Sequence, residues 1–164
     1  MNIADIRDLY AYDEWATDLV VEAVTPLTEE QYRRDLGSSH GGVHGTLTHL
    51  HGADRIWLDR MLGSAQPRIT SPEEVPDLAD MKRRVAEYQN DMNGYIGKLS
   101  DEKLQEKFSY TDIRGNPWTT VLWHAMVHKV NHASYHRGQI ITMLRQLGAK
   151  PVTTDMIAWF RKNR

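Results

Sequence analysis

Residues 124–148 read HAMVHKVNHASYHRGQIITMLRQLG, with histidines at positions 124, 128, 132 and 136. Side chains four residues apart stand one above the other on an α-helix, where two imidazoles can reach one metal ion. Each four-residue step also turns by roughly 40°, so the first and last histidines diverge by about 120°. Only neighbouring histidines can share an ion. The stretch therefore predicts a helix that contributes two ligands to a metal site.

The apolar residues of this predicted helix indicate which two histidines point inward. They gather on one side, which the helix should bury; they are Leu122, Ala125, Met126, Ala133, Ile140, Met143, Leu144 and Leu147. His132 and His136 lie on or beside that side, and the other two histidines turn away from it. Catalytic zinc-type sites usually have three protein ligands and one open position. A third ligand must therefore come from elsewhere in the chain.

Composition limits the classes of protein to which the chain can belong. A length of 164 residues predicts a single domain over 1–164, and a net charge of −2 with scattered basic residues argues against a nucleic-acid partner. The absence of cysteine excludes disulfides and thiolate ligands, so nitrogen and oxygen must hold any metal. No signal peptide or membrane-spanning run is visible, so we expect a cytoplasmic chain with no membrane partner.

Hydrophobic periodicity predicts a chain built mainly from helices. A Pro-rich loop is expected over 63–76, and residues 107–117 suit an irregular connection or a small hairpin. The long helices are expected over 3–24, 43–61, 78–99 and from 118 or 119 to about 148, followed by a short helix over 154–161. These elements predict an all-α fold.

The second predicted helix contains the candidates for the third ligand. His49 and His51 lie on opposite flanks of its apolar face, so periodicity does not choose between them. Asp54 lies close to that face and could be an oxygen ligand, a hydrogen-bond acceptor for a ligand imidazole or an ordinary exposed or paired carboxylate. We rank the last alternative first. His40 and His44, near the start of this helix, are expected to be exposed loop or first-turn residues.

Further polar residues could line a substrate pocket or support the ligands. Lys129 falls near the centre of the apolar face of its helix, where an unpaired ammonium group would be costly. The simplest interpretation is a buried stem with the charged head reaching solvent, and a catalytic or anion-binding lysine is the alternative. Tyr135, Arg137 and Trp57 are other candidates to orient a substrate.

The sequence resembles the DinB/YfiT-like superfamily of metal-dependent enzymes, which is unrelated to the DNA polymerase that shares the name. The resemblance rests first on residues 131–140, NHASYHRGQI, continuing to Leu144, Arg145 and Gly148. It extends to residues 49–57, HLHGADRIW, where the family pattern places a histidine eight residues before a tryptophan and so favours His49 over His51.

The N-terminal helix adds a weaker part of the resemblance. Tyr12, Trp15 and Ala16 match the family pattern, whereas Asp13 and Thr17 stand where asparagine is expected. Because those asparagines are not ligands, the departure affects local hydrogen bonding and leaves the metal site unchanged.

The resemblance implies an up-down four-helix bundle with an additional short C-terminal helix, commonly a homodimer, that holds one divalent ion. Carried over by position, the ligands are His49, His132 and His136, with His128 as a neighbour of the site. Zinc and nickel are the preferred ions, and iron, manganese and cobalt are alternatives. Related proteins include S-transferases and isomerases that use small thiols.

We therefore expect a metal-dependent enzyme that activates a small thiol or water for attack on an electrophilic small molecule. A thiol S-transferase is the first hypothesis and a metal-dependent hydrolase the second. The opposing hypothesis is a non-catalytic metal-binding bundle of the stress response.

Overall fold

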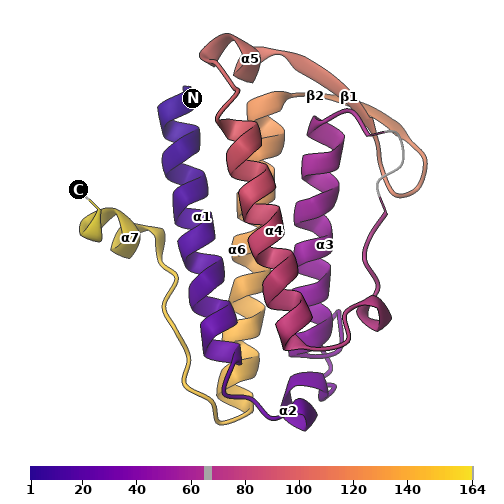
Figure 1. The fold of residues 1–164 in the computed structure, drawn as a ribbon, viewed down its shortest axis with the longest axis vertical. Helices are drawn as coiled ribbons and strands as arrows, with labels where there is room; N and C mark the ends of the chain where they lie inside the picture. The colour runs from indigo at the N-terminus through magenta and orange to yellow at the C-terminus, as the bar shows by residue number, and fades with distance from the viewer. Residues whose placement is uncertain (65–67, 164) are drawn as a thin grey trace.

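The computed structural model describes residues 1–64 and 68–163, and the chain is mostly helical. Four long helices lie side by side along its longest axis (Figure 1): α1 (Ile3–Val24), α3 (Val43–Met61), α4 (Leu78–Ile96) and α6 (Leu122–Gln146). Contacts run from α1 to α6, from α6 to α3, from α3 to α4 and from α4 back to α1. Each long helix therefore packs against two others, and side chains from all four can meet in the interior.

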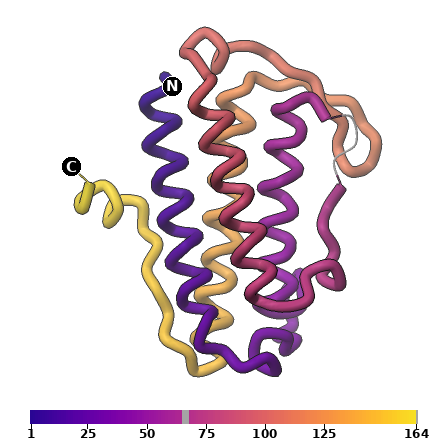
Figure 2. Tube along the Cα trace, in the orientation of Figure 1, coloured from indigo at the N-terminus to yellow at the C-terminus, as the bar shows by residue number. Residues whose placement is uncertain are grey.

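Shorter elements connect the long helices. They are α2 (Glu29–Arg33), the 3₁₀ helix η1 (Pro72–Glu74), α5 (Asp101–Gln105), β1 (Lys107–Thr111), β2 (Pro117–Val121) and α7 (Met156–Lys162). Part of the predicted loop over 63–76 falls on residues 65–67, which lie outside the described residues. Figure 2 shows the C-terminal segment running back beside α1. The Tyr12 hydroxyl donates to the Thr154 carbonyl at 2.9 Å, which fixes this segment against α1.

The antiparallel hairpin of β1 and β2 is where the structure departs from an all-α fold. Lys107 pairs with Val121 and Thr111 with Pro117. Residues 118–121, expected to begin the last long helix, instead form β2, so α6 begins at Leu122. The physical reason is that the β-branched Thr119, Thr120 and Val121 favour extended backbone once a partner strand is available.

The helix ends follow local sequence signals. Asn2 and Asp5 form a reciprocal capping box at the start of α1, and Thr28 and Gln31 form another at the start of α2. At the end of α6, Gly148 adopts a positive φ of 71°, which glycine tolerates without steric cost. These signals set the lengths of the helices that position the interior residues.

The apolar interior consists of two clusters with a polar layer between them. One contains Val24, Leu47 and Ile140, and the other contains Ile6, Leu58 and Met126. Four charged side chains at most 5% exposed lie between these clusters along the helices, and we call them the ionic cluster: Asp13, Asp54, Lys129 and Arg137. The middle of the structure is therefore polar, at the level from which the histidines of α3 and α6 also project.

None of the helices within residues 1–64 and 68–163 combines the length and the apolar character needed to cross a membrane.

Candidate metal centre

Three histidines from α3 and α6 come together midway along these helices. The ring centres of His49 and His136 are 4.6 Å apart, those of His132 and His136 are 4.4 Å apart, and those of His49 and His132 are 5.3 Å apart. The Nε2 atoms of His132 and His136 approach to 3.1 Å. The four-residue spacing on α6 thus produces the predicted pair, and α3 places His49 opposite it.

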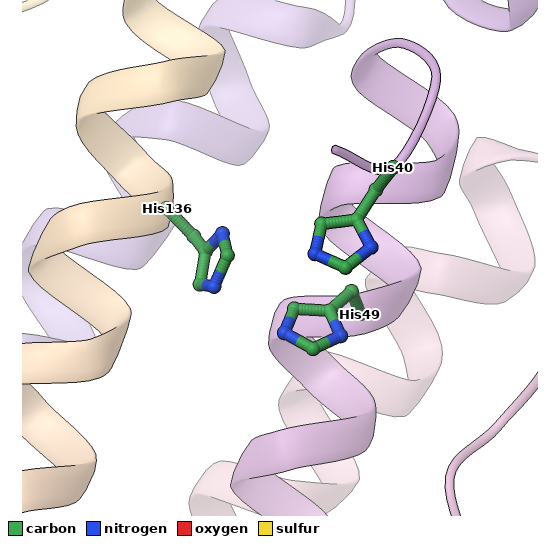
Figure 3. Close-up of side chains that lie close together, drawn as sticks. All are labelled: His40, His49 and His136. Atoms are coloured by element: carbon green, nitrogen blue, oxygen red, sulfur yellow. The ribbon is translucent and has the colours of Figure 1, made fainter. Parts of the chain in front are cut away.

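A fourth histidine, His40, joins this group from the loop between α2 and α3. Its ring stacks on that of His49 at 3.8 Å with an interplanar angle of 14°, and lies 5.4 Å from that of His136. One ring nitrogen from each of these three residues lies within 4.8 Å of the others, and Figure 3 shows His136 facing His40 and His49. The expectation of an exposed loop residue was therefore wrong, because His40 is half-buried against the site. We call His40, His49, His132 and His136 the histidine cluster.

Two overlapping sets of ligands are possible within the histidine cluster. His49 and His136 belong to both sets, and either His40 or His132 completes a triad. The nitrogen spacing within 4.8 Å favours His40, whereas the 3.1 Å contact to His136 favours His132. Bonds of about 2.0–2.1 Å to a tetrahedral ion would separate neighbouring nitrogens by about 3.3 Å. We give more weight to the His132 contact because its separation is close to that value.

Glycines explain how the loop brings His40 against α3. Gly41 adopts a positive φ of 76°. A Cβ atom on Gly45 would lie 2.0 Å from the His40 carbonyl oxygen, and one on Gly42 would lie 2.0 Å from the Arg34 carbonyl oxygen. Both contacts are with backbone and cannot be relieved by a side-chain rotation. The absence of side chains at Gly42 and Gly45 therefore allows the backbone at His40 to lie directly on the first turn of α3.

The protonation of the histidine cluster suits metal binding. Burial, and then the charges of the neighbouring histidines, lower the pKa of His49 to about 4. Burial and then His136 lower the pKa of His132 to about 4, and burial also lowers the pKa of His40 and His136. Neutral imidazoles carry one bare nitrogen each, which is the form that binds metal.

A hydrogen bond selects the tautomer of His136. Its Nδ1 lies 2.7 Å from the side-chain oxygen of Gln139, so an Nδ1–H donates to that oxygen and leaves the Nε2 lone pair directed at the cluster. The sequence reasoning missed Gln139, although its position three residues after His136 places the two side chains on one face of α6.

Comparisons with known proteins show the family to which the chain belongs. The model of the DinB family matches residues 1–162. The chain belongs to the DinB family. Protein DinB of Bacillus subtilis (strain 168) is 26% identical over 158 residues, which cover 90% of this chain and 88% of that protein. The crystal structure of a DinB-like protein from Bacillus cereus ATCC 10987 matches with a TM-score of 0.64 at 16% identity, over 93% of this chain and 97% of that chain. The resemblance seen in the sequence is thus confirmed.

Other histidines of this DinB-family chain take different places. His51 is 7% exposed and faces α4, with its ring 6.5 Å from that of Tyr88. The structure therefore places His49, and not His51, in the histidine cluster. His44 is also buried, with its Nε2 2.9 Å from the Val75 carbonyl oxygen, where a first-turn exposed residue was expected. His128 is exposed beside the cluster, its ring 6.2 Å from that of His132.

Lys129 and Asp54 lie in the ionic cluster of this DinB-family chain. The Lys129 ammonium group is 1% exposed, binds Asp13 and lies 3.1 Å from Asp54 Oδ1. The interpretation that its charged head reaches solvent was therefore wrong, because two carboxylates compensate it inside the protein. Arg137 Nη1 donates to Asp13 Oδ1 at 2.5 Å and to the Thr17 hydroxyl at 3.0 Å. Asp13 and Thr17, where the sequence resemblance led us to expect asparagine, thus both bind Arg137.

The two carboxyl groups of the ionic cluster have pKa values shifted in opposite directions. Burial raises the pKa of Asp54 to about 7 although Lys129, with its positive charge, acts in the opposite direction. Burial also opposes ionisation of Asp13, but Lys129 and Arg137 together lower its pKa below the ordinary value. Asp13 is therefore the permanent anion of the cluster.

Two aromatic candidates flank the histidine cluster. Tyr135 is 64% exposed and packs edge-on against His136 at 5.0 Å between ring centres. Trp57 packs edge-on against His128 at 5.1 Å. Beside His40 and His49 lies a cavity of about 260 Å³, lined by His40, Gly45, Thr48, His49, Ile69, Thr70 and Pro72. The cluster thus has apolar and hydroxyl surfaces beside it where a small molecule could bind.

Proposed function

We propose that this DinB-family chain binds one divalent metal ion through His49, His132 and His136, and that it transfers a small thiol to an electrophilic small molecule. The observation that carries the proposal is the convergence of these histidines from two helices, with the Nε2 atoms of His132 and His136 3.1 Å apart. An all-imidazole donor set suits zinc or nickel first, and iron, manganese or cobalt as alternatives. Family membership and the histidine cluster both support a metal-binding protein.

When bound, the ion supplies positive charge that lowers the pKa of a coordinated thiol or water. Because the ligands are neutral imidazoles, they leave that charge uncompensated. Gln139 holds the His136 tautomer, and the burial that lowers the pKa of His49 and His132 keeps protons from competing for their nitrogens near neutral pH. The chain has no cysteine, so a thiol nucleophile must be a separate small molecule.

Water in place of the thiol would make the same site a hydrolase. The two activities differ only in the group that occupies the position left open by three protein ligands. A thiol-conjugation assay and a hydrolysis assay on the same metal-loaded protein separate them.

The position of His40 favours a second class of function. Its ring lies on that of His49, and a fourth imidazole would complete a tetrahedral set. A site closed by four protein ligands is structural, as expected for a non-catalytic stress-response bundle. In that case metal removal lowers the melting temperature sharply, and thiols or electrophiles leave the protein unchanged. His40→Ala would then open the coordination sphere.

The test of the proposed function is a thiol-conjugation assay on metal-loaded protein with an aryl halide as the electrophile. We expect turnover in the wild type and none in His136→Ala, with the helical content of the variant unchanged by circular dichroism. Full activity and full metal occupancy in His136→Ala would show that the site is assigned to the wrong residues. His124→Ala, a change at an exposed histidine of the same helix, is the matched control.

We also propose an up-down four-helix bundle, a single domain and a homodimer. The contacts of each long helix with two others support the bundle, and the family match over residues 1–162 supports one domain. The homodimer rests on the family resemblance alone, and sedimentation equilibrium tests it.

A further inference from the structure

Arg60 is a buried arginine that forms no ion pair within residues 1–64 and 68–163. It lies on the last turn of α3 and is 7% exposed, and its Nε makes no hydrogen bond to any residue within 1–64 or 68–163. In the same part of the chain, no carboxylate forms an ion pair with it. By contrast, the buried guanidinium of Arg137 forms an ion pair with the carboxylate of Asp13. An unpaired buried cation costs free energy, so Arg60 calls for a compensating group from outside the chain.

Two aromatic rings lie against the Arg60 guanidinium. Its Cζ atom is 4.7 Å from the centre of the Trp57 ring and 4.9 Å from that of the Tyr110 ring. Cation–π contacts of this kind do not use the N–H donors of the group, which stay available for hydrogen bonds. Those in-plane donors match the two oxygens of a carboxylate, which arginine binds bidentately. Strand β1 contributes Tyr110, so the hairpin supplies one of the two aromatic contacts with Arg60 of α3.

Acidic groups near Arg60 do not satisfy it. Asp112, in the hairpin turn, receives hydrogen bonds from the Trp118 indole at 3.0 Å and from the Asn116 backbone at 2.9 Å. Burial lowers the pKa of Arg60, and the charges of Tyr110 and Asp112 offset that effect only in part. The guanidinium therefore has two aromatic contacts, and no carboxylate of residues 1–64 and 68–163 forms an ion pair with it.

Arg60 lies on the same face of α3 as His49. The eleven helical steps from His49 to Arg60 correspond to a rise of about 16 Å and a net rotation of only about 20°. Side chains connect the two positions: Trp57 packs against His128 at 5.1 Å, and the His128 ring lies 6.2 Å from that of His132. A molecule lying along this face could contact the histidine cluster at one end and Arg60 at the other.

We propose that Arg60 binds the carboxylate of a small molecule whose thiol or electrophilic group lies at the histidine cluster. The ligand class is an organic acid with its reactive group up to about 16 Å from the carboxylate, comparable to an extended chain of up to about five amino-acid residues. The inference rests on the proposed function for the reactive end of the ligand. The carboxylate end depends only on Arg60, Trp57 and Tyr110.

The test uses the full-length chain loaded with Co²⁺ and two series of thiols. One series is ω-mercaptocarboxylic acids of increasing chain length, and the other is the ω-mercaptoalcohols of equal length. Sulfur-to-metal absorption reports binding of each thiol. We expect the acid to bind about ten- to a hundredfold more tightly than the alcohol at the chain length that spans the two sites, because it forms a charge-assisted hydrogen bond.

Three variants test whether Arg60 causes the preference for the acid over the alcohol. Arg60→Met should abolish the preference for the acid while the alcohols bind as before. Arg60→Lys keeps the charge but loses the planar donor pair, so it should retain only part of the preference. Arg145→Met removes one positive charge from an exposed position of α6 and should bind as the wild type does. No preference at any chain length, or a preference that survives in Arg60→Met, would overturn the proposal.

A second measurement needs neither metal nor thiol. In ¹⁵N-labelled metal-free protein, propionate should shift the Nε–H resonance of Arg60 and 1-propanol should not. If the thiols fail to bind the metal, the proposed function fails and this measurement still decides the inference. An unmoved Arg60 resonance at saturating propionate would overturn it, and equal shifts with propionate and propanol would do the same.

Discussion

Replacing Asp13 by asparagine should destabilise the protein more than any change at an exposed acidic residue. Asp13 is 4% exposed and binds both Lys129 and Arg137. Its loss would leave two buried cations with Asp54 as their remaining anion. Breaking a buried ion pair by removing one partner costs about 3–5 kcal/mol. Because Asp54 still lies 3.1 Å from the Lys129 ammonium group, we expect the lower end of that range, about 3 kcal/mol.

The assay is urea and thermal unfolding of metal-free protein, so that metal release does not contribute. A loss of about 3 kcal/mol corresponds to a fall in melting temperature of about 6–12 °C for a chain of this size. Asp8→Asn, an exposed acidic position on the same helix, is the control and should change stability by less than about 0.5 kcal/mol. Adding Lys129→Met to Asp13→Asn should cost less than the two separate losses added together. A loss below about 1 kcal/mol in Asp13→Asn would refute the reasoning that Asp13 compensates both cations.

Three further changes test other parts of the structure. Burial raises the pKa of Asp54 from 3.8 to about 7, so this residue holds more protons in the folded protein than in the unfolded chain between these values, and its contribution to stability should rise as pH falls through this range. The lowered pKa values of His49 and His132 act in the opposite direction, so the test is the difference in melting temperature between the wild type and Asp54→Asn, which should shift in favour of the wild type from about pH 8 to about pH 5. Gln139→Ala removes the hydrogen bond that fixes the His136 tautomer, so it should weaken metal binding about 10- to 100-fold in a competition titration with a chelator. An unchanged affinity would show that Gln139 does not support the metal site. Gly45→Ala should destabilise the protein by about 1–3 kcal/mol in urea unfolding, because the alanine Cβ would clash with the His40 carbonyl oxygen. This cost should exceed the gain from the higher helix propensity of alanine. A variant more stable than the wild type would contradict the clash.

Local sequence signals were sufficient for most helices. Hydrophobic periodicity predicted α1 from Ile3 to Val24, with Pro26 as its stop signal, and α3 from Val43 to Met61, and both begin and end at those residues. The start of α6 was predicted three or four residues too early. Residues 118–121 can extend a helix or form a strand, and the choice depends on pairing with β1, which precedes them by about ten residues. Strand pairing of this kind is a tertiary contact, which secondary-structure propensity alone does not predict.

The histidine cluster and its surroundings also divide into features set by local sequence and features set by tertiary contacts. The four-residue spacing of His132 and His136 is a property of one helix, so the sequence revealed the pair directly. The partners of Lys129 are not visible in this way, because Asp13 lies 116 residues earlier in the chain. His40 and Arg60 were missed for a similar reason. The first depends on how a glycine-containing loop folds back onto α3, and the second depends on Tyr110 from the hairpin.

Metal analysis of untagged protein tests the central claim most directly. Inductively coupled plasma mass spectrometry of the purified chain should find about one divalent ion per chain, in keeping with a single site built from imidazole ligands. A variant that combines His49→Ala with His136→Ala should lose the ion and keep its helical content. The absence of any metal above trace, both as purified and after incubation with zinc, nickel, cobalt, iron or manganese, would contradict the account.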